Sequence, residues 1–512
     1  MSWNYLGTAY AAMGKPFDAV RALRRALSAT ADVSQVLKQM AAVGRNFNLR
    51  TIETWSLRRL IAIDPRPEYM HALGLSLCYS GLTEAGIRQF RKMLLVQPSA
   101  AIAQSGIAMG CQMVSSFHPL QVYEEHCRWD LINSRDSYST GPALLRRRGN
   151  RPLRVGYISG QFTDCSHSFF FEPILEGHSP DRIQSFCYSN SQTSDGITRR
   201  LRTHAYRWRN ILGCSDDIAT DLIRRDRIDI LVDLDGHANG NRLTLFARKP
   251  VARQLTYLGY PNTTGLGAMD YRITDSMCDP PGETEHYHTE TLLRLDPCFL
   301  NYRPPADAPP VRRQSTSTTG SIVFACFNSM SKIPVDCLQL FADVLAAVPD
   351  SRLLLKCQSL YDPTLVRRIL RFFAARGVAE TRISPLAFAT TRFEHLLRYQ
   401  QADIALDSTP YVGTTTTCEA LWMGVPVVSL VGKTHVQRVG KTLLNQAGLP
   451  ELAVNTRTEF VAAAARLAAQ RSRLAEVREN LRAQLQKSDL LQGEPFVRRF
   501  EDLLIRTVMP SK

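Results

Sequence analysis

The sequence predicts a front of paired helices followed by two α/β domains, and three observations lead to this architecture. A repeated helical pattern fills residues 1–100, short buried strands then alternate with helical segments, and a Pro-, Ser- and Thr-rich linker at 304–320 interrupts that alternation. We therefore expect helical repeats, a helical connector at 101–149, one α/β domain at 150–303, the linker, and a second α/β domain at 321–512.

Composition restricts the class of protein. Of the 512 residues, 44% are hydrophobic and 21% are charged, which is typical of a globular chain with several domains. No apolar run approaches the roughly 20 residues of a membrane span, and the N-terminus has no signal-peptide pattern. Twelve scattered cysteines without paired CxxC motifs are typical of reduced thiols. We expect a cytoplasmic protein that does not bind membranes.

The net charge of +15 favours anionic ligands. The basic residues are spread along the chain, and the runs at 146–148 and 224–225 are short. Such runs are most often solvated faces. We therefore predict no specific nucleic-acid binding.

The front of the chain carries tetratricopeptide-like units. The first unit matches the pattern W-x2-L-G-x2-Y and the small residues of the second helix at Trp3, Leu6, Gly7, Tyr10, Ala19 and Ala26. A further unit matches at Leu73, Gly74, Phe90 and Pro98. The unit between them has Met40 and Ala41 where Leu-Gly is expected. Stacked helix pairs offer a groove for acceptor peptides; a plain helical bundle is the alternative. Because the chain begins inside the tryptophan motif, we expect upstream repeats to be missing.

The first α/β domain begins with a strand at 153–160 that runs into a glycine turn, and a second clear strand lies at 228–237. The other α/β domain begins with the apolar strand at 321–327. Ligands of open parallel sheets bind beyond the carboxyl ends of the strands. We therefore look for site residues in the loops that follow these strands.

The segment from 402 to 431 is the most informative part of the chain. It reads as a buried strand, a loop with Gly413, four threonines at 414–417 that open a helix, and a returning strand. The free N–H groups of a helix start bind phosphate, and a glycine allows close approach. Glu419 is placed to accept a hydrogen bond from a sugar hydroxyl. An ordinary capped helix explains one or two of the threonines, not the run.

These stretches resemble the SPINDLY and O-GlcNAc transferase family. Besides the helical repeats, the matching segments are 235–237, 258–265, 269–275, 327–333 and 413–424. The resemblance implies two facing Rossmann-like domains in the GT-B arrangement. It also implies an inverting transfer, without a required metal, from a nucleotide sugar to Ser or Thr of an acceptor protein.

The resemblance leaves two donors open. UDP-GlcNAc is our leading prediction, and GDP-fucose, which the plant SPINDLY enzyme uses, is the alternative. The motifs at 260–265 and 413–419 are closer to SPINDLY. Glu419 stands where the animal enzymes have a ribose-binding aspartate, Ser329 replaces a glutamine and Arg392 replaces a lysine. The departures at Glu419 and Ser329 weaken the assignment of UDP.

The resemblance also implies roles for individual donor-site residues. Lys332 matches the lysine that contacts the diphosphate, where it would stabilise the charge of the leaving group with the N–H groups of Thr415 and Thr416. His395 matches the residue that stacks on the nucleobase. The other implied donor contacts are Ser329, Arg392, Arg398, Thr414, Glu419, Gly259 and Pro261.

The acceptor side departs from the family, because Cys165 stands where a histidine is proposed as base. A thiol is a weak substitute for imidazole. His167, two residues on, would point the same way on an extended segment and is our first candidate for the base. His237 is a second candidate, which Asp233 and Asp235 would orient. A third hypothesis is a repeat scaffold that lost activity with its base.

Overall fold

The structure is a computed structural model that describes residues 3–134, 151–312 and 320–509. The predicted basic run at 146–148 and part of the predicted linker lie outside the described residues. The chain forms two compact units, which we describe separately. The first unit comprises Met1–Ser116, Ser315–Tyr411 and Arg457–Leu474, and the second comprises Phe117–Gln314, Val412–Thr456 and Ala475–Lys512.

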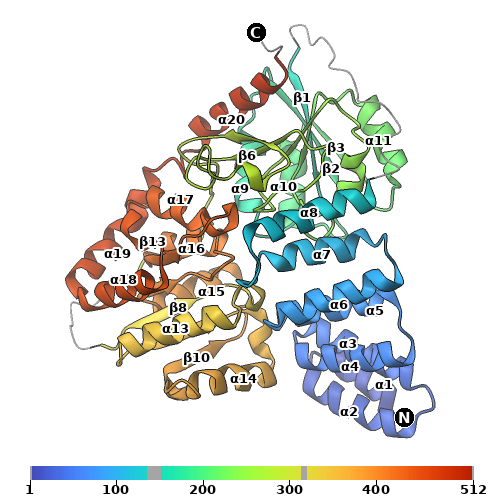
Figure 1. Ribbon diagram of the computed structural model, residues 1–512, viewed down its shortest axis with the longest axis vertical. Coiled ribbons are helices and arrows are strands. Elements are labelled where there is room, and N and C mark those ends of the chain that lie inside the picture. The colour runs from blue at the N-terminus through green and yellow to red at the C-terminus, as the bar shows by residue number, and fades with distance from the viewer. Residues whose placement is uncertain (1–2, 135–150, 313–319, 510–512) are drawn as a thin grey trace. The chain divides into compact units, whose positions relative to one another are not determined.

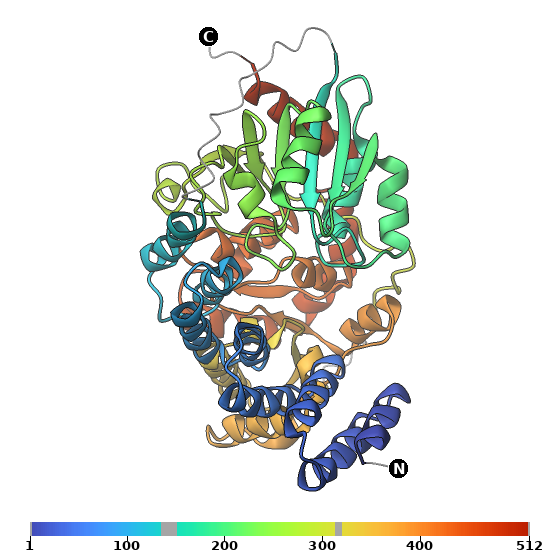
Figure 2. The same ribbon diagram turned by 90° about the vertical axis from the view of Figure 1, so that its right-hand side faces the viewer.

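The first unit begins with helices that follow one another as stacked hairpins (Figures 1 and 2, blue). The helices are α1 (Trp3–Ala12), α2 (Pro16–Ala29), α3 (Val33–Asn46), α4 (Arg50–Ile63), α5 (Pro67–Tyr79), α6 (Thr83–Val96) and α7 (Ala101–Cys111). Gly7 lets α1 and α2 approach, because a Cβ there would lie 2.6 Å from Leu23 Cγ. In the degraded middle pair, Met40 and Ala41 are still buried. The predicted helical repeats are confirmed.

The same unit contains a parallel sheet in the order β10-β9-β8-β11. The strands are β8 (Val323–Cys326), β9 (Arg352–Lys356), β10 (Ile383–Leu386) and β11 (Ile404–Leu406). Helices α13 (Val335–Ala347), α14 (Pro363–Ala374), α15 (Arg392–Leu397) and α18 (Arg457–Ala469) alternate with the strands or follow them.

Polar contacts fix the repeat helices to the loops of this sheet. The backbone N–H and the hydroxyl of Thr51 both donate to Asp362, each at 2.7 Å. The Ser359 hydroxyl donates to the Tyr79 carbonyl at 2.7 Å. Asp362 also caps the start of α14 through the N–H of Thr364. The repeats and this α/β layer therefore form one packed body.

The second unit is built on a seven-stranded parallel sheet in the order β3-β2-β1-β4-β5-β6-β7 (Figure 1). The strands are β1 (Leu153–Ser159), β2 (Ile183–Ser189), β3 (Arg207–Asn210), β4 (Ile230–Asp233), β5 (Arg253–Thr256), β6 (Tyr271–Thr274) and β7 (Thr291–Arg294). The connecting helices include α9 (Ser168–Gly177), α10 (Gly196–His204), α11 (Asp216–Arg225) and α12 (Leu243–Ala247). Two parallel sheets after helical repeats confirm the predicted fold class.

Elements from other parts of the sequence complete the second unit. They are α8 (Pro119–Asn133), α16 (Thr415–Trp422), α17 (Val439–Gln446), the strand pair β12 (Val427–Leu430) and β13 (Ala453–Val454), and α20 (Gly493–Thr507). Each compact unit thus combines three segments that are separated in the sequence. The predicted domain boundaries stay predictions. No helix in the described parts of the chain is long and apolar enough to cross a bilayer.

Helix α20 packs its apolar face into the second unit. Phe500 is fully buried, and its ring lies 5.2 Å from that of Tyr257. Beside it, Glu501 accepts hydrogen bonds from the Ser179 N–H at 2.8 Å and pairs with Arg182 at 2.9 Å. A buried carboxylate with these partners fixes the position of the helix along the sheet unit.

Replacing Phe500 with alanine should lower the free energy of unfolding by about 3–5 kcal/mol, because the change leaves a cavity in a well-packed core. Urea unfolding followed by circular dichroism measures the loss. Leu131→Ala on α8 is the matched control, since that side chain is 62% exposed; it should cost less than about 0.5 kcal/mol. Equal losses in the two variants would contradict the packing role of Phe500.

Candidate active site

Lys332 is the predicted site residue with the most unusual surroundings in the first unit. It ends η3 (Met330–Lys332), a short 3₁₀ turn beyond the carboxyl end of β8. Its Nζ lies 4.2 Å from the centre of the Tyr411 ring. Burial lowers the pKa of Lys332 to about 8, although the nearby Asp407 carboxylate acts in the opposite direction. An ammonium held in such a site gains strongly from an incoming anion.

Ser329 directly precedes the same turn, and its hydroxyl lies 3.0 Å from the Ser331 hydroxyl. Serine is shorter than the glutamine of the animal enzymes, and here its side chain bonds within its own turn. Ser329 therefore lies on the same loop as Lys332, three residues before it.

His395 lies on α15, and this helix begins with a capping box formed by Thr391 and Glu394. Its Nδ1 is 2.5 Å from Nζ of Lys356, a lysine that is only 3% exposed at the end of β9. A lysine ammonium only donates, so Nδ1 accepts and the ring proton sits on Nε2. Phe327 adds an aromatic wall, with its ring 6.1 Å from that of His395.

Lys356 is a residue that our sequence analysis missed. The signal was present, since a lysine closes an otherwise apolar strand, Arg352–Lys356, at the end of the sheet where ligands bind. The two predicted arginines lie on the His395 segment itself. Arg392 is the first residue of α15 and is partly buried, whereas Arg398 follows the helix and is exposed.

In the second unit, the threonine run opens α16 as predicted. Thr414 is the N-cap residue but makes no side-chain capping bond. Thr417 turns inward, and its hydroxyl donates to the Gly413 carbonyl at 3.1 Å. Thr414, Thr415 and Thr416 stay partly exposed, while Glu419 is buried one turn deeper. The run is thus more than a helix cap, and it leaves hydroxyl groups at the helix start within reach of a ligand.

The loop after β1 holds Cys165 and His167 together. The Cys165 thiol donates to the Gln161 carbonyl, with Sγ 3.3 Å from the oxygen, and Sγ also lies 3.3 Å from Nδ1 of His167. Because a thiol has one proton, Nδ1 must be the donor in the second contact, which leaves the lone pair of the ring on Nε2.

Both groups of this pair are neutral near pH 7. Burial raises the pKa of the Cys165 thiol to about 11 and lowers the pKa of His167 to about 4. Cys165 is therefore a thiol rather than a nucleophilic thiolate. His167 is an uncharged imidazole, which is the form that accepts a proton.

The structure brings this loop to the start of α16. The Thr415 hydroxyl donates to the carbonyl of Ser166, the residue between Cys165 and His167, at 3.3 Å. Residues about 250 positions apart in sequence therefore meet within one compact unit. The candidate base and the candidate anion site are neighbours there.

His237, the second candidate base, is buried in an aromatic cluster after β4. Its Nε2 lies 2.7 Å from the Thr264 carbonyl, and its ring packs against those of Trp129 and Tyr260 at 5.7 Å and 5.3 Å. Burial lowers the pKa of His237 to about 3. These contacts tie α8 to the loop after β5, and they favour a packing role over proton transfer.

The aspartates expected to orient His237 bond elsewhere. Asp233 accepts from the Thr256 hydroxyl at 2.8 Å, and Asp235 accepts from the Ser159 hydroxyl at 2.8 Å and from the Gly160 N–H at 2.6 Å. Burial raises the pKa of Asp233 to about 6 and that of Asp235 to about 7. These bonds join the carboxyl ends of three neighbouring strands and shape the loop that carries the Cys165–His167 pair.

Gly259 and Pro261 lie in the loop after β5, at the same edge of the sheet. A Cβ on Gly259 would overlap the Leu234 carbonyl oxygen, so only glycine lets this loop pass the end of β4. Between the two residues, Tyr260 is buried, and its hydroxyl lies 2.7 Å from Nε2 of His126. Within the described ranges, no group of three or more His, Cys, Asp or Glu side chains is arranged to hold a metal ion.

Comparisons with known proteins agree with this arrangement. The profile of glycosyl transferase family 41 matches residues 132–300 and 310–500. The probable UDP-N-acetylglucosamine–peptide N-acetylglucosaminyltransferase SPINDLY of Oryza sativa is 35% identical over 81% of this chain and 45% of its own length. The protein of the same name from Arabidopsis thaliana is 38% identical over 67% of this chain and 37% of its own.

A solved structure is similar along the whole chain. A point variant of the Thermobaculum terrenum O-GlcNAc transferase is 34% identical, with a TM-score of 0.89 over 99% of this chain and 97% of that one. The chain spans less than half the length of the curated SPINDLY relatives named above. The profile nevertheless covers both α/β regions that carry the candidate residues. The chain therefore belongs to glycosyl transferase family 41.

Proposed function

We propose that the chain transfers a sugar from a nucleotide-sugar donor to Ser or Thr hydroxyls of acceptor proteins, with inversion and without a metal. The observation that carries this proposal is the half-buried Lys332, whose lowered pKa and position over Tyr411 suit the binding of a leaving diphosphate. A fixed cation supplies the charge stabilisation that a metal ion supplies elsewhere. The start of α16 supports the proposal as a second anion-binding element.

In the proposed reaction, the acceptor hydroxyl replaces the diphosphate in a single displacement. The acceptor oxygen attacks the anomeric carbon as the bond from that carbon to the diphosphate oxygen breaks, so the configuration inverts. The acceptor proton passes to Nε2 of His167, and the diphosphate leaves with the bonding electron pair. The Cys165 contact supports this role, because it directs the ring lone pair to Nε2. An available imidazole also argues against an inactive scaffold.

UDP-GlcNAc is the donor we propose. Its support is the similarity to the SPINDLY proteins, which are named as probable UDP-N-acetylglucosamine–peptide N-acetylglucosaminyltransferases. GDP-fucose is the alternative, and Ser329 and Glu419 motivate it because both depart from the animal residues at the donor site. Lys356 beside His395 belongs to the base pocket under either donor.

Thermal-shift titration with UDP, GDP and their sugars tests the donor. UDP and UDP-GlcNAc should raise the melting temperature, and stabilisation by GDP nucleotides alone would reassign the donor to GDP-fucose. Transfer of labelled sugar to protein in a cell lysate tests the reaction itself. A complete lack of label with both donors would overturn the proposed activity in favour of the scaffold.

Binding of the nucleoside diphosphate should weaken by about tenfold between pH 7 and pH 9. The folded protein loses the Lys332 proton as the pH rises through about 8, and only the protonated lysine attracts the diphosphate. Isothermal titration calorimetry at each pH measures the change. A Lys332→Arg variant keeps its charge and should vary by less than about twofold. The same pH dependence in both proteins would show that another group is responsible.

A further inference from the structure

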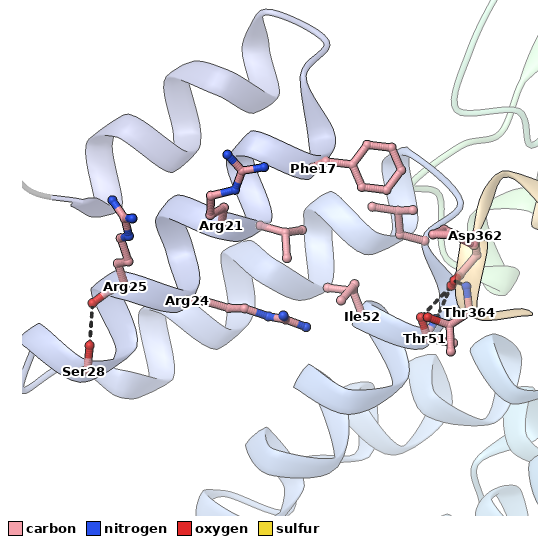
Figure 3. A pocket seen from close by; sticks show the side chains of 12 residues that line it. Phe17, Arg21, Arg24, Arg25, Ser28, Thr51, Ile52, Asp362 and Thr364 are labelled. Carbon is pink, nitrogen blue, oxygen red and sulfur yellow. Dashed lines mark hydrogen bonds between the residues drawn. The ribbon is translucent and has the colours of Figure 1, made fainter. Parts of the chain in front are cut away.

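A pocket of about 480 Å³ lies in the first unit, between the first two helix pairs and the start of α14 (Figure 3). The helix α2, the turn into α4 and the first residues of α14 form its walls. The lining residues are Phe17, Val20, Arg21, Arg24, Arg25, Ser28, Leu49, Thr51, Ile52, Asp362, Pro363 and Thr364. None of them has a role in the proposed transfer.

Three arginines give one wall of this pocket a strong positive charge. Arg21, Arg24 and Arg25 follow one another at the spacing that places side chains on one side of α2. Acidic side chains neutralise these arginines only weakly. Among the residues that the structure describes, Arg21 pairs with Asp18 alone, at 3.6 Å, and both side chains are well exposed. Arg25 lies over the Trp3 ring at 4.7 Å, and Arg24 has no ion pair within the described part of the chain.

Asp362, the one carboxylate among the described lining residues, does not neutralise these arginines. Both hydrogen bonds from Thr51 go to one oxygen of Asp362, at 2.7 Å each, and the N–H of Thr364 goes to the other, at 2.9 Å (Figure 3). The surrounding helices add to the positive field, since residues 1–100 contain thirteen Lys and Arg against six Asp and Glu. An anionic partner is therefore attracted to this wall.

Apolar side chains also line the pocket. Val20 and Leu49 are buried beneath it, and Ile52 packs against the same core. Phe17 is 48% exposed at the rim, where its ring stacks on that of Tyr361 at 5.8 Å. Figure 3 shows Arg24 extending from α2 toward Ile52, so cationic and apolar groups border the same space.

We propose that this pocket docks an acidic segment of the acceptor protein, in which Asp or Glu residues stand next to a Leu or Phe. The proposal rests on the proposed function, because it names the class of acceptor. The apolar floor and the size of the space suit a side chain with its flanking backbone better than a free phosphate ion. Arginine pairs with carboxylates through two parallel hydrogen bonds, which adds geometric selectivity.

Fluorescence anisotropy with the full chain tests the proposal without any sugar donor. The probe is a fluorescein-labelled dodecapeptide that alternates Glu with Leu and Ser, and a Lys-for-Glu version is its counterpart. The Glu peptide should bind, the Lys peptide should not, and the R21E/R24E/R25E variant should weaken binding at least tenfold. All three arginines are exposed, so the variant should keep its circular dichroism spectrum and melting temperature. If it does not, the R21Q/R24Q/R25Q variant replaces it in the binding measurement.

The matched control is R88E/R91E/K92E on α6. These residues have the same spacing, are exposed, change the net charge equally and lie outside the pocket. The control should weaken peptide binding by less than twofold. Equal weakening by both variants would overturn the proposal, because it would indicate a diffuse electrostatic effect. Competition by millimolar inorganic phosphate at constant ionic strength, or tighter binding of a 12-nucleotide single strand, would overturn it in favour of a simple anion site or a nucleic-acid site.

The two proposals fail separately. If the peptide binds as expected but no sugar is transferred, the proposed function fails and the docking site stands. If sugar is transferred, but the R21E/R24E/R25E variant modifies both acidic and neutral acceptor proteins at the same rate as the unaltered chain, the docking proposal fails and the transfer stands. We expect a tenfold loss of kcat/KM for the acidic acceptor only.

Discussion

Replacing Lys332 with methionine should lower the rate of sugar transfer by about 10²–10³-fold, the loss typical of removing one preorganised stabilising group from a transition state. Methionine has nearly the same length and fits beside Tyr411, so the loss reports the missing charge. Transfer of radiolabelled sugar under saturating donor and acceptor measures kcat. The loss should appear in kcat more than in KM for the acceptor, because the charge of the leaving diphosphate develops in the transition state.

The fold should survive this change. Burial of the Lys332 ammonium is unfavourable, as its lowered pKa shows, so methionine should leave the melting temperature unchanged or raise it. Lys487→Met, at an exposed position, is the matched control and should keep full activity. A Lys332→Met enzyme with more than half of the original kcat would remove Lys332 from the mechanism.

Replacing His167 with alanine should reduce kcat by about 10²–10⁴-fold, the usual contribution of a general base. The variant keeps the Cys165 thiol, so the comparison isolates the imidazole. The pH profile is the second readout: the acidic limb, which reports protonation of His167, should disappear in the variant. His286→Ala changes an exposed histidine in the same unit and should leave both kcat and the profile unchanged.

Variants of Cys165 separate positioning from packing. A serine there can donate to the Gln161 carbonyl and accept from Nδ1 of His167, so Cys165→Ser should keep most of the activity. Cys165→Ala cannot accept that proton, and it should lose about tenfold in kcat as the ring exchanges tautomers. If the His167→Ala variant keeps the full kcat, the effects of Cys165→Ser and Cys165→Ala cannot be assigned to proton transfer.

The repeats were predictable because their signal is local. Gly7 and Ala19 lie where helix pairs must approach closely, and the same positions are packed in the structure. The start of α16 was equally predictable, since a glycine and four threonines have few other uses. The presence of parallel sheets followed from the alternation of strands and helices, whereas the order of their strands did not. In each case the pattern within about thirty residues determines the element.

Contacts between distant segments were not predictable. Asp233, Asp235 and His237 stand close together in sequence, yet the aspartates bond to strand ends and the histidine to Thr264. The partnership of Lys356 with His395 depends on how β9 and α15 approach. A single sequence contains no direct record of such distances. The candidate residues were therefore easier to name than to assign to roles.

The path of the backbone has a practical consequence for shortened proteins. The polypeptide passes from one compact body to the other five times, and its final segment belongs with the sheet whose first strand begins at Leu153, far away in the sequence. No single cut yields two halves that each contain a whole core. A gene fragment that stops at Gln492 would lack α20 and leave Tyr257 without its Phe500 neighbour. Such fragments should accumulate as aggregates, and the two halves should be obtained folded only when the complete polypeptide is made.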